Sequence, residues 1–159
     1  MAKTTGSDLL VRALRAEGVD TVFGVAGDHI LHMLDTMFDS SIRMVDFRHE
    51  SGSGHAADSY SRILNKGGVN LSTTPGHANA LAALANALHS EAPLINIAGS
   101  AESPNMGRGA MQEFDQVGAA APITKGAWNV PSPARIPEYV ALAFRTALSG
   151  RQGPVHLTI

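Results

Sequence analysis

The chain has 159 residues and a formal net charge of −2, with 44% hydrophobic residues, 16% charged residues and no cysteine. A chain of this length forms one domain with a substantial core, and its near-neutral charge gives no basic surface for nucleic acid. The lack of cysteine excludes disulfides, thiolate metal sites and thiol nucleophiles.

Strand and helix patterns alternate along the chain. Residues 1–6 lack the apolar core of a secretion signal, and no apolar run is long enough to span a membrane, so we expect a cytoplasmic protein without a membrane partner. Helical spacing predicts helices over residues 7–17, 28–38, 50–64, 77–89 and 136–148. Apolar runs predict strands over residues 21–25, 42–47, 69–73, 93–98 and 155–159, with a further strand within 123–130. This alternation indicates a three-layer α/β fold, in which a mostly parallel six-stranded sheet carries helices on both faces.

Glu50 lies where the strand at 42–47 ends and the helix at 50–64 begins. We expect this strand to be buried, and we expect the helix to turn inward an apolar face that comprises Ala56, Ala57, Tyr60, Ile63 and Leu64. Ligands of parallel α/β proteins collect at the carboxyl ends of the strands, where a carboxylate can take part in proton chemistry. An acidic residue is also favourable in any first helical turn, because it complements the helix dipole. Glu50 alone therefore leaves a catalytic and an ordinary structural interpretation open.

Three other segments carry residues suited to binding. Residues 73–79 place a glycine after a proline at a strand-to-helix turn, which lets the backbone approach a planar ligand, although a plain turn fits equally well. Residues 24–27 follow a strand but do not match the G-x-G-x-x-G pattern, which argues against a dinucleotide site. His29 and His32 lie three residues apart on one helical face, yet no third ligand follows at a telling spacing, so we expect no metal site.

The order of the motifs resembles the amino-terminal pyrimidine-binding domain of thiamine diphosphate enzymes, in particular the group of acetohydroxyacid synthase, benzoylformate decarboxylase and pyruvate oxidase. The resemblance covers essentially the whole chain. It rests on seven segments in the right order and spacing, at residues 22–28, 48–50, 58–62, 74–79, 112–115, 124–125 and 153–157. It implies the thiamine diphosphate-binding fold, and a chain 1–159 that is a single pyrimidine-binding domain without the central and diphosphate-binding domains.

The resemblance also implies roles for individual residues. Glu50 would hydrogen-bond ring nitrogen N1′ of the cofactor's aminopyrimidine and activate the cofactor for reaction with a 2-oxo acid. The residues that would pack on the pyrimidine ring are Thr74, Pro75, Gly76 and Asn79. Those that would line the active site are Gly24, Ala26 and Gly27, from the partner subunit's side, and Gln112, which would reach toward substrate and cofactor.

Several departures from the family pattern limit these expectations. Residues 24–27 lack the proline of the usual G-x-P-G, and Thr74 replaces a common glycine or serine. Asp28 matches an acid–base aspartate of pyruvate decarboxylases, but the paired histidines of those enzymes are missing, so we expect no catalytic role for Asp28. The Gly-Asp-Gly motif that holds magnesium and the diphosphate is also missing. The motif and its magnesium ion would be supplied by a diphosphate-binding domain of the same or another chain.

The expected function is therefore the pyrimidine-binding half of a thiamine diphosphate-dependent 2-oxo acid decarboxylase or carboligase, similar to acetolactate synthase and inactive alone. We expect a homodimer or higher oligomer, formed through the helices that follow Glu50 and Gly76. Two alternatives are a stand-alone subunit of a split enzyme such as sulfopyruvate decarboxylase and a non-catalytic dimerisation module. A metal-dependent hydrolase built on His29 and His32 is more remote. The identity of the 2-oxo acid, and the choice between decarboxylation and carboligation, stay open.

Overall fold

Six parallel strands form the centre of the molecule, in a computed structural model that describes residues 4–159. The first three residues, which belong to the amino-terminal segment considered above, lie outside the described range. The strands lie in the order β2-β1-β3-β4-β6-β5, and every neighbouring pair is parallel. Their bounds are β1 Thr21–Gly24, β2 Arg43–Asp46, β3 Gly68–Ser72, β4 Leu94–Ala98, β5 Ala127–Asn129 and β6 Val155–Thr158.

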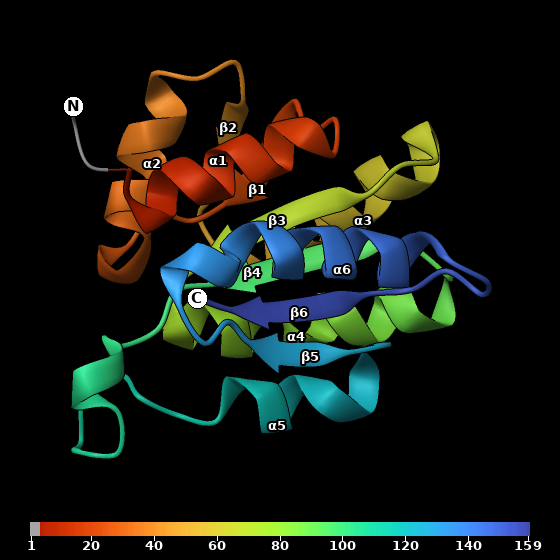
Figure 1. Cartoon of the computed structure of the whole chain (residues 1–159). Helices are drawn as coiled ribbons and strands as arrows, with labels where there is room; N and C mark the ends of the chain where they lie inside the picture. Colours follow the sequence, from red (N-terminus) through yellow and green to blue (C-terminus); the bar gives the residue numbers. More distant parts are fainter. Residues whose placement is uncertain (1–3) are drawn as a thin grey trace.

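Helices cover both faces of this sheet (Figure 1). One face carries α1 (Gly6–Ala16), α2 (Leu31–Phe38) and α6 (Ile136–Leu148), and the other carries α3 (Glu50–Leu64), α4 (Thr74–His89) and α5 (Gln116–Ala120). Short 3-10 turns complete the chain: η1 (Asp28–Ile30), η2 (Ser103–Asn105), η3 (Ala121–Ile123) and η4 (Pro133–Arg135). The predicted three-layer α/β fold is confirmed.

The two faces of the sheet differ in chemistry, because successive side chains of a strand point to opposite faces. Toward α1 and α6, the neighbouring strands β3, β4 and β6 present only aliphatic side chains, namely Val69, Leu71, Ile95, Ile97, Val155 and Leu157. Toward α3 and α4, the same strands present a buried row of polar side chains, which we call the polar seam: Asn70, Ser72, Asn96, His156 and Thr158. Asn70 lies opposite Asn96, and Asn96 opposite His156, on neighbouring strands.

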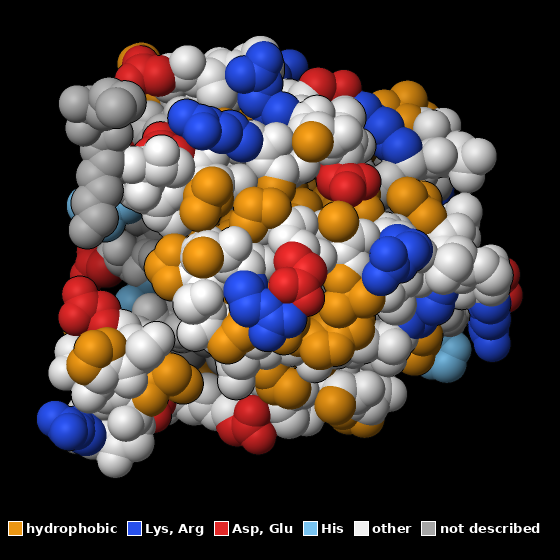
Figure 2. Space-filling model, viewed as in Figure 1, with side chains coloured by type: hydrophobic (Ala, Val, Ile, Leu, Met, Phe, Trp, Pro, Cys, Tyr) orange, Lys and Arg blue, Asp and Glu red, His pale blue; other side chains and the backbone are white. Residues whose placement is uncertain are grey.

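The α1 and α6 side holds most of the apolar core. Helix α1 begins with a capping box, in which the Thr5 amide donates to Asp8 Oδ2 at 2.7 Å and the Asp8 amide donates to Thr5 Oγ1 at 3.1 Å. Leu10 and Leu14 of this helix are fully buried. Figure 2 shows hydrophobic side chains gathered across the middle of this face, so apolar groups extend from the core to its surface.

Helix α3 packs on α4 through small residues, and the predicted apolar face of α3 is wrong in part. Ala57 is buried as expected, but Ile63 is 79% exposed and Leu64 is 49% exposed. The buried side of α3 instead carries small or polar residues, among them Ser53, Gly54 and Ser61. A Cβ at Gly54 would lie 2.7 Å from Ala83 Cβ, so the two helices approach too closely for a larger side chain.

Other differences from the prediction concern the ends of elements. Strand β2 is not buried but lies half-exposed at the edge of the sheet. Helix α4 begins at Thr74 rather than His77, since Pro75 fits the first helical turn. Helix α5 and turn η3 were not predicted, and they shorten the strand expected within 123–130 to Ala127–Asn129. Within the described part of the chain, no helix combines the length and the apolar character needed to cross a membrane.

Lys125 closes the carboxyl end of α6. Its Nζ donates to the carbonyls of Thr146 and Ser149, the latter at 2.7 Å. A cation at this end of a helix satisfies free carbonyls and opposes the negative end of the dipole. We expect Lys125→Met to lower the free energy of unfolding by about 1–2 kcal/mol, measured by urea denaturation.

Arg145 provides the control for this prediction, because it is an exposed cation in the last turn of the same helix. Arg145→Gln removes a charge but neither of the Lys125 hydrogen bonds, and it should change the free energy of unfolding by less than about 0.5 kcal/mol. Equal effects of the two substitutions would show that Lys125 acts only through its charge.

Candidate functional site

The carboxylate of Glu50 lies between the first turns of two helices. Glu50 is the first residue of α3 and is partly buried. Asn79 of α4 donates its Nδ2 to Glu50 Oε2 at 2.9 Å. A Cβ placed on Gly76 would lie 2.8 Å from Glu50 Oε1 and from its Cγ, so the carboxylate rests on the bare backbone of Gly76. One carboxylate oxygen is therefore held by an amide, and the other faces the backbone of the α4 turn.

The α4 turn is itself fixed by Thr74. Thr74 is buried, and its Oγ1 donates to the carbonyl of Gly99, just after β4, at 3.0 Å. Gln116 Nε2 approaches the same hydroxyl at 3.4 Å and the Gly99 carbonyl at 3.3 Å. Pro75, the next residue, is exposed. The sequence-predicted residues Glu50, Thr74, Gly76 and Asn79 thus meet at the carboxyl end of the sheet, with Pro75 on the outside of the turn.

The other site residues predicted from the sequence are Gly24, Ala26, Gly27 and Gln112. Gly24 is the buried last residue of β1, and Gly27 packs on Thr73, where a Cβ would meet Thr73 Cγ2 at 2.4 Å. Ala26 is exposed and borders an apolar cavity of about 390 Å³ beside Phe38 and Met44. Gln112 is exposed, with a left-handed backbone at φ 61°, and the described contacts do not bring it to Glu50.

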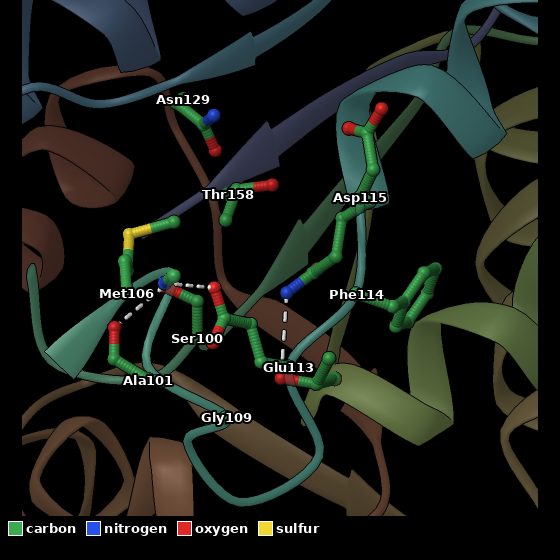
Figure 3. A pocket seen from close by; sticks show the side chains of 12 residues that line it. Ser100, Ala101, Met106, Gly109, Glu113, Phe114, Asp115, Asn129 and Thr158 are labelled. Carbon is green, nitrogen blue, oxygen red and sulfur yellow. Dashed lines mark hydrogen bonds between the residues drawn. The ribbon is translucent and has the colours of Figure 1, made fainter.

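A larger cavity of about 530 Å³ lies on the other side of Thr74 (Figure 3). Its walls come from the loop between β4 and α5 and from the ends of β5 and β6, and they include Ser100, Met106, Glu113, Phe114, Asn129 and Thr158. Glu113 ties the loop together by accepting from the amides of Gly107 and Ala110. Gln116 also lines this cavity, and its Oε1 is buried without a hydrogen-bond partner among the described residues.

The polar seam, apart from Ser72, forms a continuous hydrogen-bonded network beneath α4. Ser53 Oγ donates to Asn70 Oδ1 at 2.6 Å, and Asn70 Nδ2 donates to Asn96 Oδ1 at 2.7 Å. Asn96 Nδ2 then lies 2.9 Å from His77 Nδ1 and 3.0 Å from His156 Nδ1. The two imidazoles are stacked with their centroids 4.0 Å apart. The network therefore joins α3, three strands and the first turn of α4.

The hydrogen bonds of this network fit two neutral histidines. Because Asn96 Oδ1 accepts from Asn70, its Nδ2 must be the atom that faces the imidazoles, and it has one hydrogen for each Nδ1. Each ring then carries its proton on Nε2, which donates to the Gln116 carbonyl from His77 and to Thr158 Oγ1 from His156. Burial lowers the pKa of His77 from 6.5 to about 4, although the hydrogen bond to Gln116 opposes the shift. Burial, with the nearby His77, also holds the pKa of His156 well below its usual value.

The sequence analysis did not identify His77, Asn96, His156 or Gln116. A signal for Asn96 and His156 was present, because residues 95–98 and 155–158 alternate apolar and polar or small side chains. Such alternation normally marks a sheet with one solvated face. Here both faces are covered, and the polar members other than Ser72 bond to each other.

The remaining candidates from the sequence do not form a second site. His29 Nδ1 lies 3.4 Å from Thr74 Oγ1, and His32 is exposed. Within residues 4–159, no group of three or more histidine, aspartate or glutamate side chains is arranged to hold a metal ion.

The chain was compared with known proteins. Residues 4–119 match the family described as "Thiamine pyrophosphate enzyme, N-terminal TPP binding domain". The chain is 37% identical over 155 residues to a protein named probable acetolactate synthase large subunit from Methanocaldococcus jannaschii, covering 97% of this chain and 26% of that protein. It is 39% identical over 155 residues to acetolactate synthase isozyme 2 large subunit from Escherichia coli, covering 97% of this chain and 28% of that protein. The chain thus spans about a quarter of the length of these relatives.

Gly76→Ala tests the contact between the α4 turn and the carboxylate. The new methyl group would lie 2.8 Å from Glu50 Oε1, and the flexible Glu50 side chain would have to move away from Asn79. We expect the NMR signals of the Asn79 side-chain amide to shift, while the free energy of unfolding changes by less than about 1 kcal/mol. Gly52→Ala on α3 is the control, since its methyl group would meet only the Phe47 ring, at 3.3 Å, and should leave the Asn79 signals unchanged.

Neutral histidines in the polar seam make stability depend on pH. Because the pKa of His77 falls from 6.5 to about 4 on folding, the unfolded chain binds a proton between these values that the folded chain does not. This contribution is fully present above about pH 6.5 and is lost as the pH falls toward 4. We expect the free energy of unfolding to decrease by up to about 3 kcal/mol over this range, measured by urea denaturation.

Two variants separate this effect from the titration of carboxylates. His77→Asn removes one of the two buried imidazoles and should reduce the dependence on pH, while His156 retains its own contribution, even though the variant is less stable at pH 7. His89→Gln removes an exposed histidine from the same helix and should leave the dependence as in the parent chain. An unchanged slope in His77→Asn would contradict the assignment.

Proposed function

The chain belongs to the thiamine pyrophosphate enzymes through their N-terminal TPP binding domain, and we propose that it is the pyrimidine-binding half of a 2-oxo acid decarboxylase or carboligase similar to acetolactate synthase. Because the chain covers only about a quarter of its relatives, the activity of the complete enzyme is part of this proposal. We also propose that residues 1–159 act as one pyrimidine-binding domain and are inactive alone.

The observation that carries the proposal is the placement of Glu50. Its Oε2 is held by Asn79, which leaves Oε1 as the oxygen available to a ring nitrogen beside Gly76. The missing side chain of Gly76 allows a flat ring to approach the helix backbone at this point. These groups fit an aminopyrimidine.

Thiamine diphosphate, when bound, supplies an electron sink for reactions of 2-oxo acids. The part played by this chain is proton control at the pyrimidine. Glu50 would hold a proton between Oε1 and the ring nitrogen, while the hydrogen bond from Asn79 keeps the carboxylate in one orientation. Thr74, bonded to the Gly99 carbonyl, would keep Pro75 and Gly76 against the ring. We propose that magnesium and the diphosphate are bound by a separate diphosphate-binding domain.

The remaining predicted residues keep their proposed places in the assembled enzyme. Gly24, Ala26 and Gly27 would line the active site from the partner subunit's side, and Gln112 would reach toward substrate and cofactor. We propose a cytoplasmic homodimer or higher oligomer that joins through α3 and α4. The exposed side chains of Ile63 and Leu64 at the end of α3 support burial against another chain.

The proposal predicts that Glu50→Gln abolishes turnover without unfolding the chain. The amide cannot exchange a proton with the ring nitrogen, so we expect a loss of at least about 100-fold. The measurement is release of carbon dioxide from pyruvate after the chain is combined with the diphosphate-binding part of an acetolactate synthase large subunit. Glu17→Gln, at the exposed end of α1, is the control and should retain activity. Turnover by Glu50→Gln at the parent rate would refute the role of Glu50.

Binding of the ring can be tested without turnover. Thiamine, which lacks the diphosphate, should shift the NMR signals of Gly76 and Asn79 when added to the labelled chain. Glu50→Ala should abolish these shifts. Shifts confined to other parts of the chain would contradict the proposed site.

A further inference from the structure

His77 lies directly beneath the proposed ring site. It follows Gly76 in the first turn of α4, is fully buried, and points toward the sheet while Gly76 meets Glu50. Its ring makes two hydrogen bonds in opposite directions, from Asn96 Nδ2 at 2.9 Å and to the Gln116 carbonyl at 3.1 Å. The first bond reaches the sheet, and the second reaches α5 at the wall of the larger cavity.

The bond to Asn96 connects the two helices that form the site. Asn96 also accepts from Asn70, which accepts from Ser53. Ser53 lies in the first turn of α3, and its hydroxyl oxygen also lies 3.0 Å from the carbonyl oxygen of Glu50. The first turns of α3 and α4 are therefore both hydrogen-bonded to the same pair of strand side chains, Asn70 and Asn96. These polar contacts, rather than apolar packing, fix the heights of the two turns above the sheet.

From this arrangement we infer that His77 is a positioning residue of the ring site: through its hydrogen bond with Asn96 it sets the first turn of α4 at the height where Gly76 and Asn79 meet the Glu50 carboxylate. The inference rests on the proposed function, because it assigns the contact a purpose in holding the ring. The contact is close, since a Cβ on Gly76 would lie 2.8 Å from Glu50 Oε1, so a shift of the α4 turn changes the surroundings of the carboxylate.

Two substitutions of His77 should each retain one of its two hydrogen bonds and remove the other. In His77→Asn, the amide oxygen takes the place of Nδ1 and can still accept from Asn96, but the bond to Gln116 is lost. In His77→Gln, the amide nitrogen takes the place of Nε2 and can still donate to the Gln116 carbonyl, but Asn96 loses its acceptor. Both variants replace the stacked ring with an amide and leave one buried group unsatisfied. A purely structural role of His77 therefore predicts similar effects of the two substitutions.

The experiment compares the two variants in the full 159-residue chain at pH 7.5. The readouts are the NMR signals of the Asn79 side-chain amide, the pH titration of the Glu50 carboxyl signal, and the dissociation constant for thiamine. In His77→Asn, all three should stay close to those of the parent chain. In His77→Gln, the Asn79 signals and the Glu50 titration should shift, and thiamine should bind about tenfold more weakly, which corresponds to ~1.4 kcal/mol.

The opposite outcomes overturn the inference. If both variants alter the Asn79 and Glu50 signals equally, or neither does, His77 only fills space. If either variant is unfolded, Asn96→Leu, which removes the same bond from the sheet side, must itself shift the Asn79 and Glu50 signals of the parent chain or the inference fails. Failure of the parent chain to bind thiamine would count against the proposed function, whereas the Asn79 and Glu50 signals judge His77 without any ligand.

Discussion

The short contact between the Glu50 carboxylate and the first turn of α4 is the constraint on which the rest of the site depends. It brings a charged group at the start of one helix to within hydrogen-bonding distance of a side-chain amide on the next helix. Two helix amino termini then face the same point, and their free amide groups favour negative charge there. The parallel sheet makes this convergence possible, since α3 and α4 both begin at the carboxyl ends of their preceding strands.

The polar seam gives this contact a rigid base. A sheet covered on both faces normally presents apolar side chains to both. In this protein, only the side toward α1 and α6 follows that rule, and the side toward α4 carries a hydrogen-bonded ladder across β3, β4 and β6. Each buried polar group in the ladder must keep its partner, because an unsatisfied group in the interior costs about 1–3 kcal/mol. The helix above it has correspondingly few alternative positions.

The sequence was sufficient for the fold and for part of the site. Alternating strand and helix patterns predicted the layers, and the family resemblance named Glu50, Gly76 and Asn79, which the structure brings together. The seam was missed because alternation within a short strand does not tell whether its polar side meets water or another helix. Ile63 was misplaced because helical periodicity cannot show that α3 and α4 pack through Gly54 and Ala83. Helix α5 was missed because residues 116–120 have too few large apolar side chains to show a helical stripe.

The unequal faces of the sheet also protect it from misalignment during folding. If β3, β4 or β6 slipped by one residue against its neighbour, every side chain of that strand would turn to the opposite face. Asn96 or His156 would then enter the aliphatic layer, and Ile97 or Leu157 would displace the ladder. A sheet with two equally apolar faces would not have this energetic penalty for a shift in register. The buried asparagine and histidine side chains therefore favour the native register of β3, β4 and β6 over a register shifted by one residue.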